Sequence, residues 1–122
     1  INKRNKIAKI YDETFKNLPV RFIKVDSNNL CSYHLYVILI DNKKKRDDLY
    51  NEMLKKGFKC NIHYIPIYKH SFYKKKLKFN SKNFENSEYY FKNCLSIPLF
   101  PDLKTYEIKK IIEIVKKFFN EK

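Results

Sequence analysis

The sequence predicts an α+β domain in which a few strands form a small layer, packed on one side by helices. Two observations predict this class: apolar residues recur at helical spacing in several segments, and apolar or aromatic runs bounded by turn residues lie between them. A length of 122 residues with 43% apolar content suffices for one compact core. Because no repeat and no Gly/Ser linker divides the chain, we expect one domain over residues 1–122.

The first helix is predicted over residues 2–17. Its apolar positions share one helical face: Ile7, Ile10, Tyr11, Phe15 and Leu18. Pro19 then prevents the helix from continuing. A short extended segment is expected at residues 21–25, and the strongest strand signal follows at residues 33–40, which are apolar or aromatic on both faces. Such a strand is covered on both sides, or its second face meets another part of a larger protein.

A second amphipathic helix is predicted over residues 46–56, closed by Gly57, the only glycine of the chain. Residues 59–65 are expected to be extended, and Pro66 ends that segment. Residues 67–79 are aromatic and basic without a clear period, so an irregular loop is expected there.

The last third of the chain is predicted to hold two helices. A short helix over residues 86–94 leads into the strand-like residues 95–98. Thr105 is expected to cap the last helix. That helix has a nearly ideal buried stripe: Ile108, Ile111, Ile112, Val115, Phe118 and Phe119.

The net charge of +14 raises the expectation of a nucleic-acid or anionic membrane partner. The excess is nearly all lysine, however, because Arg4, Arg21 and Arg46 are the only arginines. Arginine makes the bidentate contacts to phosphate and guanine, so a lysine excess spread along the chain argues against a dedicated nucleic-acid reader. We therefore expect neither nucleic acid nor membrane as a partner.

No apolar run approaches the roughly 20 residues that span a bilayer, and the first residues do not form a signal peptide. A cytoplasmic protein is expected. Cys31, Cys60 and Cys94 are widely spaced, which favours reduced, structural thiols. Cys60, His63 and His70 do not match the spacing of a zinc site, so no metal is expected.

Three clusters carry more than fold information: residues 32–36 (Ser-Tyr-His-Leu-Tyr), residues 63–68 (His-Tyr-Ile-Pro-Ile-Tyr) with Tyr73, and residues 95–101 (Leu-Ser-Ile-Pro-Leu-Phe-Pro). They occur together with Lys3-Arg4-Asn5-Lys6-Ile7-Ala8 and Tyr11, with Arg46-Asp47-x-Leu49 and with Lys56-Gly57-Phe58. In order and spacing this set resembles the C-terminal domain of the DegT/DnrJ/EryC1/StrS aminotransferases. It is most similar to the branch that aminates a UDP-linked 4-keto sugar in pseudaminic acid synthesis.

The resemblance implies the small C-terminal domain of a fold-type-I transferase that depends on pyridoxal phosphate (PLP), with a short, mostly antiparallel sheet. In this family a large N-terminal domain binds PLP, the small domain closes over the substrate, and the enzyme is a homodimer. The implied reaction transfers an amino group from glutamate or a similar donor to a UDP-linked 4-keto-6-deoxy sugar for surface glycans. The N-terminal domain is expected to be missing here, and Ile1 in place of Met suggests truncation.

The chemistry of such an enzyme needs a Schiff-base lysine, a carboxylate for the pyridinium nitrogen and a phosphate cup. None of these is assignable here. The lysines lie in solvated runs such as residues 43–45 and 74–76, and a single glycine cannot form a Gly-rich phosphate loop. We therefore predict no catalytic and no cofactor-binding residue, and no turnover by this chain alone.

Asn61, His63, Tyr64 and Tyr68 carry over from the family as sugar-nucleotide contacts, because the family places this segment at the mouth of the active site. Phenol and imidazole groups can hydrogen-bond hydroxyl and anionic oxygens, and an aromatic face can cover the uracil or the sugar ring. The structural alternative is that His63 and Tyr64 alternate between the core and the surface of a strand. His34, on the strand at residues 33–40, is expected to be a structural histidine with satisfied hydrogen bonds.

Two functions from different classes remain. The first is a transaminase fragment that acts only with its N-terminal partner, supplying the substrate lid and part of the dimer contact. The second is a free-standing basic module that binds nucleic acid or another polyanion; a gene remnant without activity is a third reading. The lysine run at residues 74–78 is interpreted as a solvated face, or as an attraction for the substrate's diphosphate. An upstream coding segment with the Schiff-base lysine distinguishes the first function from the second.

Overall fold

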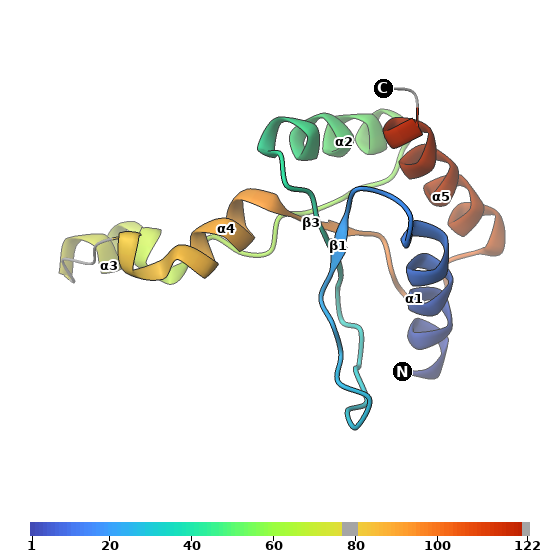
Figure 1. The fold of residues 1–122 in the computed structure, drawn as a ribbon, viewed down its shortest axis with the longest axis horizontal. Helices are drawn as coiled ribbons and strands as arrows, with labels where there is room; N and C mark the ends of the chain where they lie inside the picture. Colours follow the sequence, from blue (N-terminus) through green and yellow to red (C-terminus); the bar gives the residue numbers. More distant parts are fainter. Residues whose placement is uncertain (77–80, 121–122) are drawn as a thin grey trace.

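The computed structural model describes residues 1–76 and 81–120. The body of the molecule (Figure 1) contains, in chain order, α1 (Asn2–Phe15), β1 (Arg21–Phe22), β2 (Tyr36–Leu39), α2 (Lys43–Lys55), β3 (Cys94–Ile97) and α5 (Thr105–Asn120). Between α2 and β3 the chain leaves the body and forms an arm that contains η1 (Ile67–Lys69), α3 (Ser71–Lys76), η2 (Ser81–Phe84) and α4 (Glu85–Asn93).

The strands form an antiparallel sheet in the order β1-β2-β3. Tyr36 lies opposite Ile97, and Ile38 lies opposite Leu95. Because side chains alternate along a strand, these four share one face of the sheet. The α+β class with a short antiparallel sheet is therefore confirmed.

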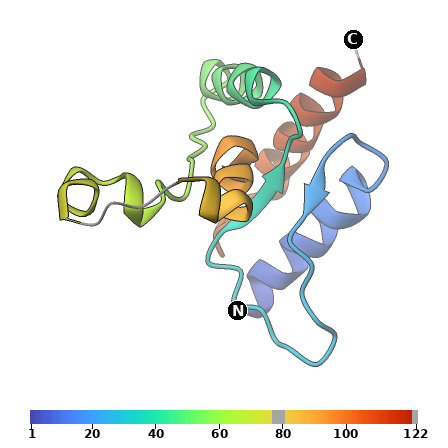
Figure 2. The ribbon, with the colours of Figure 1, turned by 60° about the vertical axis from the view of Figure 1, so that its left-hand side comes forward.

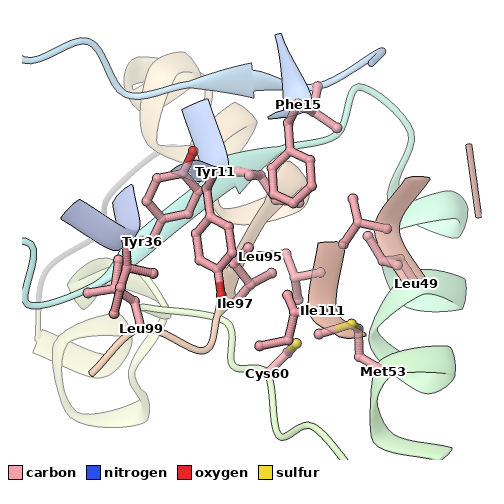
Figure 3. Packing of buried hydrophobic residues seen from close by; sticks show 14 of the residues in the cluster. Tyr11, Phe15, Tyr36, Leu49, Met53, Cys60, Leu95, Ile97, Leu99 and Ile111 are labelled. Atoms are coloured by element: carbon pink, nitrogen blue, oxygen red, sulfur yellow. The ribbon is translucent and has the colours of Figure 1, made fainter. Parts of the chain in front are cut away.

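Helices α1, α2 and α5 pack on this face, which forms the core (Figure 3). The largest fully buried side chains come from all of these elements: Tyr11 and Phe15 of α1, Ile38 of β2, Leu49 and Met53 of α2, Leu95 of β3, and Ile111 and Val115 of α5. The rings of Tyr11 and Tyr36 meet edge to face with centroids 5.0 Å apart, which joins α1 to the central strand. The expected packing of helices on one side of the sheet is confirmed.

The first two helices agree with the predicted ones, with small differences at their ends. Ile10 is 44% exposed and so lies beside the buried stripe of α1, not in it as predicted. Helix α2 begins three residues before the predicted start, because the side chain of Asn42 caps it by accepting a hydrogen bond from the Lys45 backbone N–H at 3.0 Å. Gly57 has φ +86° directly after α2, as its predicted role at the helix end requires.

The last helix begins differently from the prediction. Thr105 is its first residue, so the prediction that Thr105 caps the helix is wrong by one position. The backbone N–H of Lys104 instead donates to the carboxylate of Glu107 at 2.8 Å, which is one half of a capping box. The buried stripe is confirmed, since Ile108, Ile111 and Val115 are buried and Ile112, Phe118 and Phe119 pack against the core.

The arm replaces the irregular loop that was predicted for residues 67–79. Residues 67–69 and 71–76 are helical, and residues 77–79 lie outside the described part of the chain. Helix α4 follows at the expected place and leads directly into β3. In both views of the ribbon (Figures 1 and 2), α3 lies at the far end of the arm, away from the body. The loop prediction failed because the helical segments are too short for a periodic apolar pattern.

The segment before β2 also differs from the prediction. The strand begins at Tyr36, so His34 lies in the preceding bend and is exposed. Its expected role as a structural histidine on the strand is therefore wrong. Of the extended segment predicted at residues 59–65, a single bridge between Asn61 and Ser96 is formed.

Candidate functional site

The second face of the sheet, opposite the helices, is formed by the residues that alternate with the core positions. Val37 lies opposite Ser96, and Leu39 lies opposite Cys94. Val37, Ser96 and Cys94 are buried, although this face carries none of the three body helices. The expectation that the central strand is covered on both sides is confirmed.

The segment at residues 61–64 runs along the outer edge of β3 and covers part of this face. Asn61 and Ser96 exchange two backbone hydrogen bonds, from Asn61 N–H to Ser96 O at 3.0 Å and from Ser96 N–H to Asn61 O at 2.8 Å. The segment thus has the geometry of a short fourth strand that is paired at one position.

His63 is held against the sheet by its side chain. A 2.9 Å hydrogen bond joins His63 Nδ1 to Ser96 Oγ, and the ring is half-buried. The Cys94 thiol lies 3.8 Å from the carbonyl oxygen of His63 and donates a weak hydrogen bond to it. His63 therefore has one anchored ring nitrogen, and Nε2 is the nitrogen left for a ligand.

Tyr64 presents the exposed part of the site. Its side chain is 65% exposed, and its ring lies beside that of His63 with centroids 4.6 Å apart and planes tilted by 54°. A large aromatic side chain that remains this exposed beside an anchored histidine offers a face and a hydroxyl to a ligand.

Tyr90 of α4 completes the surroundings of the site. Burial raises the pKa of its phenol, and the nearby Cys94 and Tyr64 raise it further. Burial also raises the pKa of the Cys94 thiol against the opposing effect of Arg46, which disfavours the reactive thiolate form. Tyr90 was not among the predicted site residues; it lies on α4, four residues before Cys94 at the start of β3.

Ser96 was part of a motif in the sequence but had no predicted role. The alternation of side chains along β3 could have indicated its position. Leu95 and Ile97 are core residues, so Ser96 between them points to the opposite face of the sheet. What could not be inferred was that His63 lies there too.

The other two predicted sugar-nucleotide contacts, Asn61 and Tyr68, do not lie beside the ring of His63 as Tyr64 does. Asn61 is exposed, and its side-chain Oδ1 accepts a 3.3 Å hydrogen bond from the N–H of Ile62. Tyr68 belongs to the arm, where its ring stacks on Phe84 with centroids 4.6 Å apart and its hydroxyl donates to Glu88 at 2.9 Å. The structure thus brings His63 and Tyr64 together and gives Tyr68 a partner within the arm.

The arm contact is an ion pair as well as a hydrogen bond. Lys69 Nζ lies 2.6 Å from the second carboxylate oxygen of Glu88. This hydrogen-bonded ammonium holds the pKa of Glu88 below its usual range, while partial burial and the bond to Glu88 raise the pKa of Tyr68.

Within residues 1–76 and 81–120 no three His, Cys, Asp or Glu side chains gather as metal ligands, and no helix is long and apolar enough to cross a membrane. Every lysine whose burial the structure describes, within residues 1–76 and 83–120, is exposed.

The model of the DegT/DnrJ/EryC1/StrS aminotransferase family matches residues 1–116. Among curated proteins, the chain is 32% identical over 127 residues to the UDP-4-amino-4,6-dideoxy-N-acetyl-beta-L-altrosamine transaminase of Campylobacter jejuni, which covers 96% of the chain and 33% of the transaminase. The chain spans about a third of the length of the curated relatives it matches.

Two solved structures show the same architecture. PseC of Helicobacter pylori, an aminotransferase involved in pseudaminic acid biosynthesis, is 25% identical and superposes with a TM-score of 0.86 over 99% of this chain and 33% of its own. Protein Spr1654 of Streptococcus pneumoniae in its PLP form is 26% identical, with a TM-score of 0.86 over 98% of this chain and 31% of its own.

Proposed function

Because the chain belongs to the DegT/DnrJ/EryC1/StrS aminotransferase family, we propose that it is the C-terminal domain of a longer PLP-dependent enzyme. This enzyme transfers an amino group from glutamate or a similar donor to a UDP-linked 4-keto-6-deoxy sugar. The similarity to the Campylobacter UDP-sugar transaminase and to PseC supports this substrate class. The family and its relatives give no support to the alternative of a free-standing basic module.

The observation that carries the proposal is the pair formed by His63 and Tyr64. One ring nitrogen of His63 is anchored on buried Ser96, and the neighbouring phenol is 65% exposed. Sugar hydroxyls and diphosphate oxygens accept hydrogen bonds from imidazole and phenol donors, and an aromatic face covers a uracil or pyranose ring. We assign this pair, with Asn61, to the binding of the sugar nucleotide.

Tyr68 remains a proposed substrate contact, but the kinds of contact that it can make are limited. Its hydroxyl already donates to Glu88, so it has no second proton with which to bind a substrate oxygen. A substrate contact by Tyr68 therefore involves its ring or an acceptor lone pair of its hydroxyl.

The described residues do not fit PLP itself. A Schiff-base lysine must lose its proton to react, and burial is the usual means of lowering a lysine pKa, whereas each lysine within residues 1–76 and 83–120 is exposed. When bound, PLP supplies the electron sink for amino transfer. In our proposal the rest of the longer protein holds PLP, and this domain binds and covers the sugar nucleotide.

The exposed apolar side chains of the arm support a role in contacts with the rest of the enzyme. Ile67, Phe72 and Tyr73 are 66%, 59% and 40% exposed. A dimer partner or the cofactor domain that covers them removes this apolar surface from water. We assign the arm to the substrate lid and the dimer contact of the full-length homodimer.

The test is borohydride trapping of PLP, run in parallel on this chain and on the longer gene product that includes it. We expect reduction to fix the cofactor on the longer protein alone, and transamination of a UDP-4-keto sugar only by that protein. Trapping or turnover by the 122-residue chain would contradict the division of roles. Trapping in neither protein, with salt-sensitive binding of nucleic acid, would contradict the aminotransferase proposal itself.

A further inference from the structure

We propose that Ser96 is a positioning residue that fixes the neutral imidazole of His63 in the tautomer with the proton on Nε2. His63 then serves as a hydrogen-bond donor to a ligand oxygen and not as a base. This inference deepens the proposed function, since it rests on the assignment of His63 to the binding of the sugar nucleotide.

Ser96 holds the segment at residues 61–63 at both of its ends. Its backbone exchanges two hydrogen bonds with Asn61, and its hydroxyl lies 2.9 Å from Nδ1 of His63. Ser96 itself is only 6% exposed and lies in β3, whose neighbour β2 is the central strand of the sheet. The imidazole is thus attached to a rigid element, which fixes the direction of its free nitrogen.

The direction of the hydrogen bond follows from the donors and acceptors. If Nδ1 carried the proton, it would donate to Ser96 Oγ, and the hydroxyl proton of Ser96 would need another acceptor. The structure shows no other acceptor for this hydroxyl among the described residues. A buried donor without a partner costs more than an unused lone pair on an oxygen that already forms one bond. The Ser96 hydroxyl therefore donates to Nδ1, which leaves the imidazole proton on Nε2.

The other polar groups near His63 are compatible with this assignment. The Cys94 thiol reaches the backbone carbonyl of His63 and not its ring. The Tyr64 ring lies beside the imidazole with centroids 4.6 Å apart. Among the described residues no carboxylate is bonded to the ring, so nothing competes with Ser96 for control of the tautomer.

This arrangement limits what His63 can do. With Nδ1 occupied and Nε2 protonated, the neutral ring has no free lone pair with which to take a proton from a substrate. Its remaining capacity is one N–H donor, which suits a hydroxyl, keto or phosphate oxygen. The inferred tautomer thus suits His63 to substrate binding and not to the abstraction of a proton.

The test measures the tautomer directly. In the 122-residue chain labelled with 15N-histidine, the shifts of the two His63 ring nitrogens at neutral pH report which of them is protonated. We expect the Nε2–H form alone in the wild type, both forms in exchange in Ser96→Ala, and recovery of the single form in Ser96→Thr. Cys94→Ala is the matched control, because it removes the neighbouring side chain on the same face of β3 without touching the ring.

The second arm uses the longer protein. Ser96→Ala should raise the KM for the sugar nucleotide about fivefold, the effect of weakening one neutral hydrogen bond, with little change in kcat. A wild-type Nδ1–H tautomer, or a tautomer unchanged in Ser96→Ala, would overturn the inference. A confirmed tautomer together with an unchanged KM would retain Ser96 as the residue that sets the ring and would reject His63 as a substrate contact. A kcat loss at constant KM would reject the donor role in favour of proton transfer.

Discussion

The hydroxyl of Tyr68 donates a 2.9 Å hydrogen bond to Glu88, a residue 20 positions further along the chain. The same carboxylate binds Lys69 at 2.6 Å, so η1 and α4 are joined at one acidic side chain. This contact orients the segment that continues from His63 and Tyr64 into the arm. One of the four predicted contacts, Tyr68, is therefore held within the arm by an acidic side chain that the sequence analysis did not single out.

The first prediction concerns this contact. Glu88→Gln removes the charge that attracts Lys69, and amide hydrogen exchange at residues 67–76 should become roughly two- to fivefold faster, as expected for a partly exposed ion pair. Exchange in the core helix α5 should not change. Glu113→Gln, a carboxyl on α5, is the control and should leave the arm unaffected. Unchanged exchange in Glu88→Gln would mean that the arm is held by its aromatic contacts alone.

The second prediction concerns Tyr64. In the longer protein, Tyr64→Ala should raise the KM for the sugar nucleotide about tenfold, which is the typical loss for one aromatic contact. Tyr106→Ala is a matched control, because Tyr106 on α5 is also 65% exposed but lies outside the candidate site. Equal effects of the two substitutions in steady-state kinetics would remove Tyr64 from the site.

The third prediction concerns the core. Ile111 is fully buried between α5 and the sheet, whereas Ile10 is 44% exposed on α1. Ile111→Ala should lower the free energy of unfolding by about 2–5 kcal/mol, because it removes buried methyl groups and leaves a cavity. Ile10→Ala should change it by less than about 0.5 kcal/mol. Urea denaturation measures both, and similar losses for the two variants would contradict the observed packing of α1.

The fourth prediction concerns stability at alkaline pH. Burial raises the pKa of the Cys60 thiol from 9.0 to about 12. The unfolded chain releases this proton above about pH 9 while the folded chain retains it, so the stabilisation is complete below that pH and is lost as pH rises toward 12. Over this range Cys60 should make the free energy of unfolding fall by an additional ~1.4 kcal/mol per pH unit.

The measurement compares the slope of unfolding free energy against pH between about pH 9 and pH 11 in the wild type and in Cys60→Ala. Subtraction cancels the tyrosines that do not interact with Cys60, and the contribution of Tyr11, whose pKa Cys60 helps to raise, stays in the difference. Cys31→Ala replaces a thiol that is only partly buried and is the control. Parallel slopes for the wild type and Cys60→Ala would show that Cys60 ionises normally in the folded protein.

The long, periodic elements could be predicted from the sequence because their signals are local. The apolar stripe from Ile108 to Val115 indicates the buried face of a helix. The glycine after α2 and the proline after α1 indicate where helices end, because their backbone preferences do not depend on distant contacts. Predictions failed where the helix or strand covers only a few residues. The helical turns at residues 67–76 are too short to show a periodic apolar pattern, and the apolar run at residues 33–40 does not reveal that β2 begins only at Tyr36.

The candidate site, too, was predictable from the sequence only in part. The order of the motifs indicated the family, and the resemblance to that family singled out His63 and Tyr64 as expected sugar-nucleotide contacts. Only the tertiary structure decided that Ser96 anchors His63, that Tyr64 helps to raise the pKa of Tyr90, and that Glu88 already accepts the hydrogen bond of the Tyr68 hydroxyl. The physical reason is that each of these contacts joins segments 20 to 33 residues apart or faces of different elements, and no local preference specifies such a pairing.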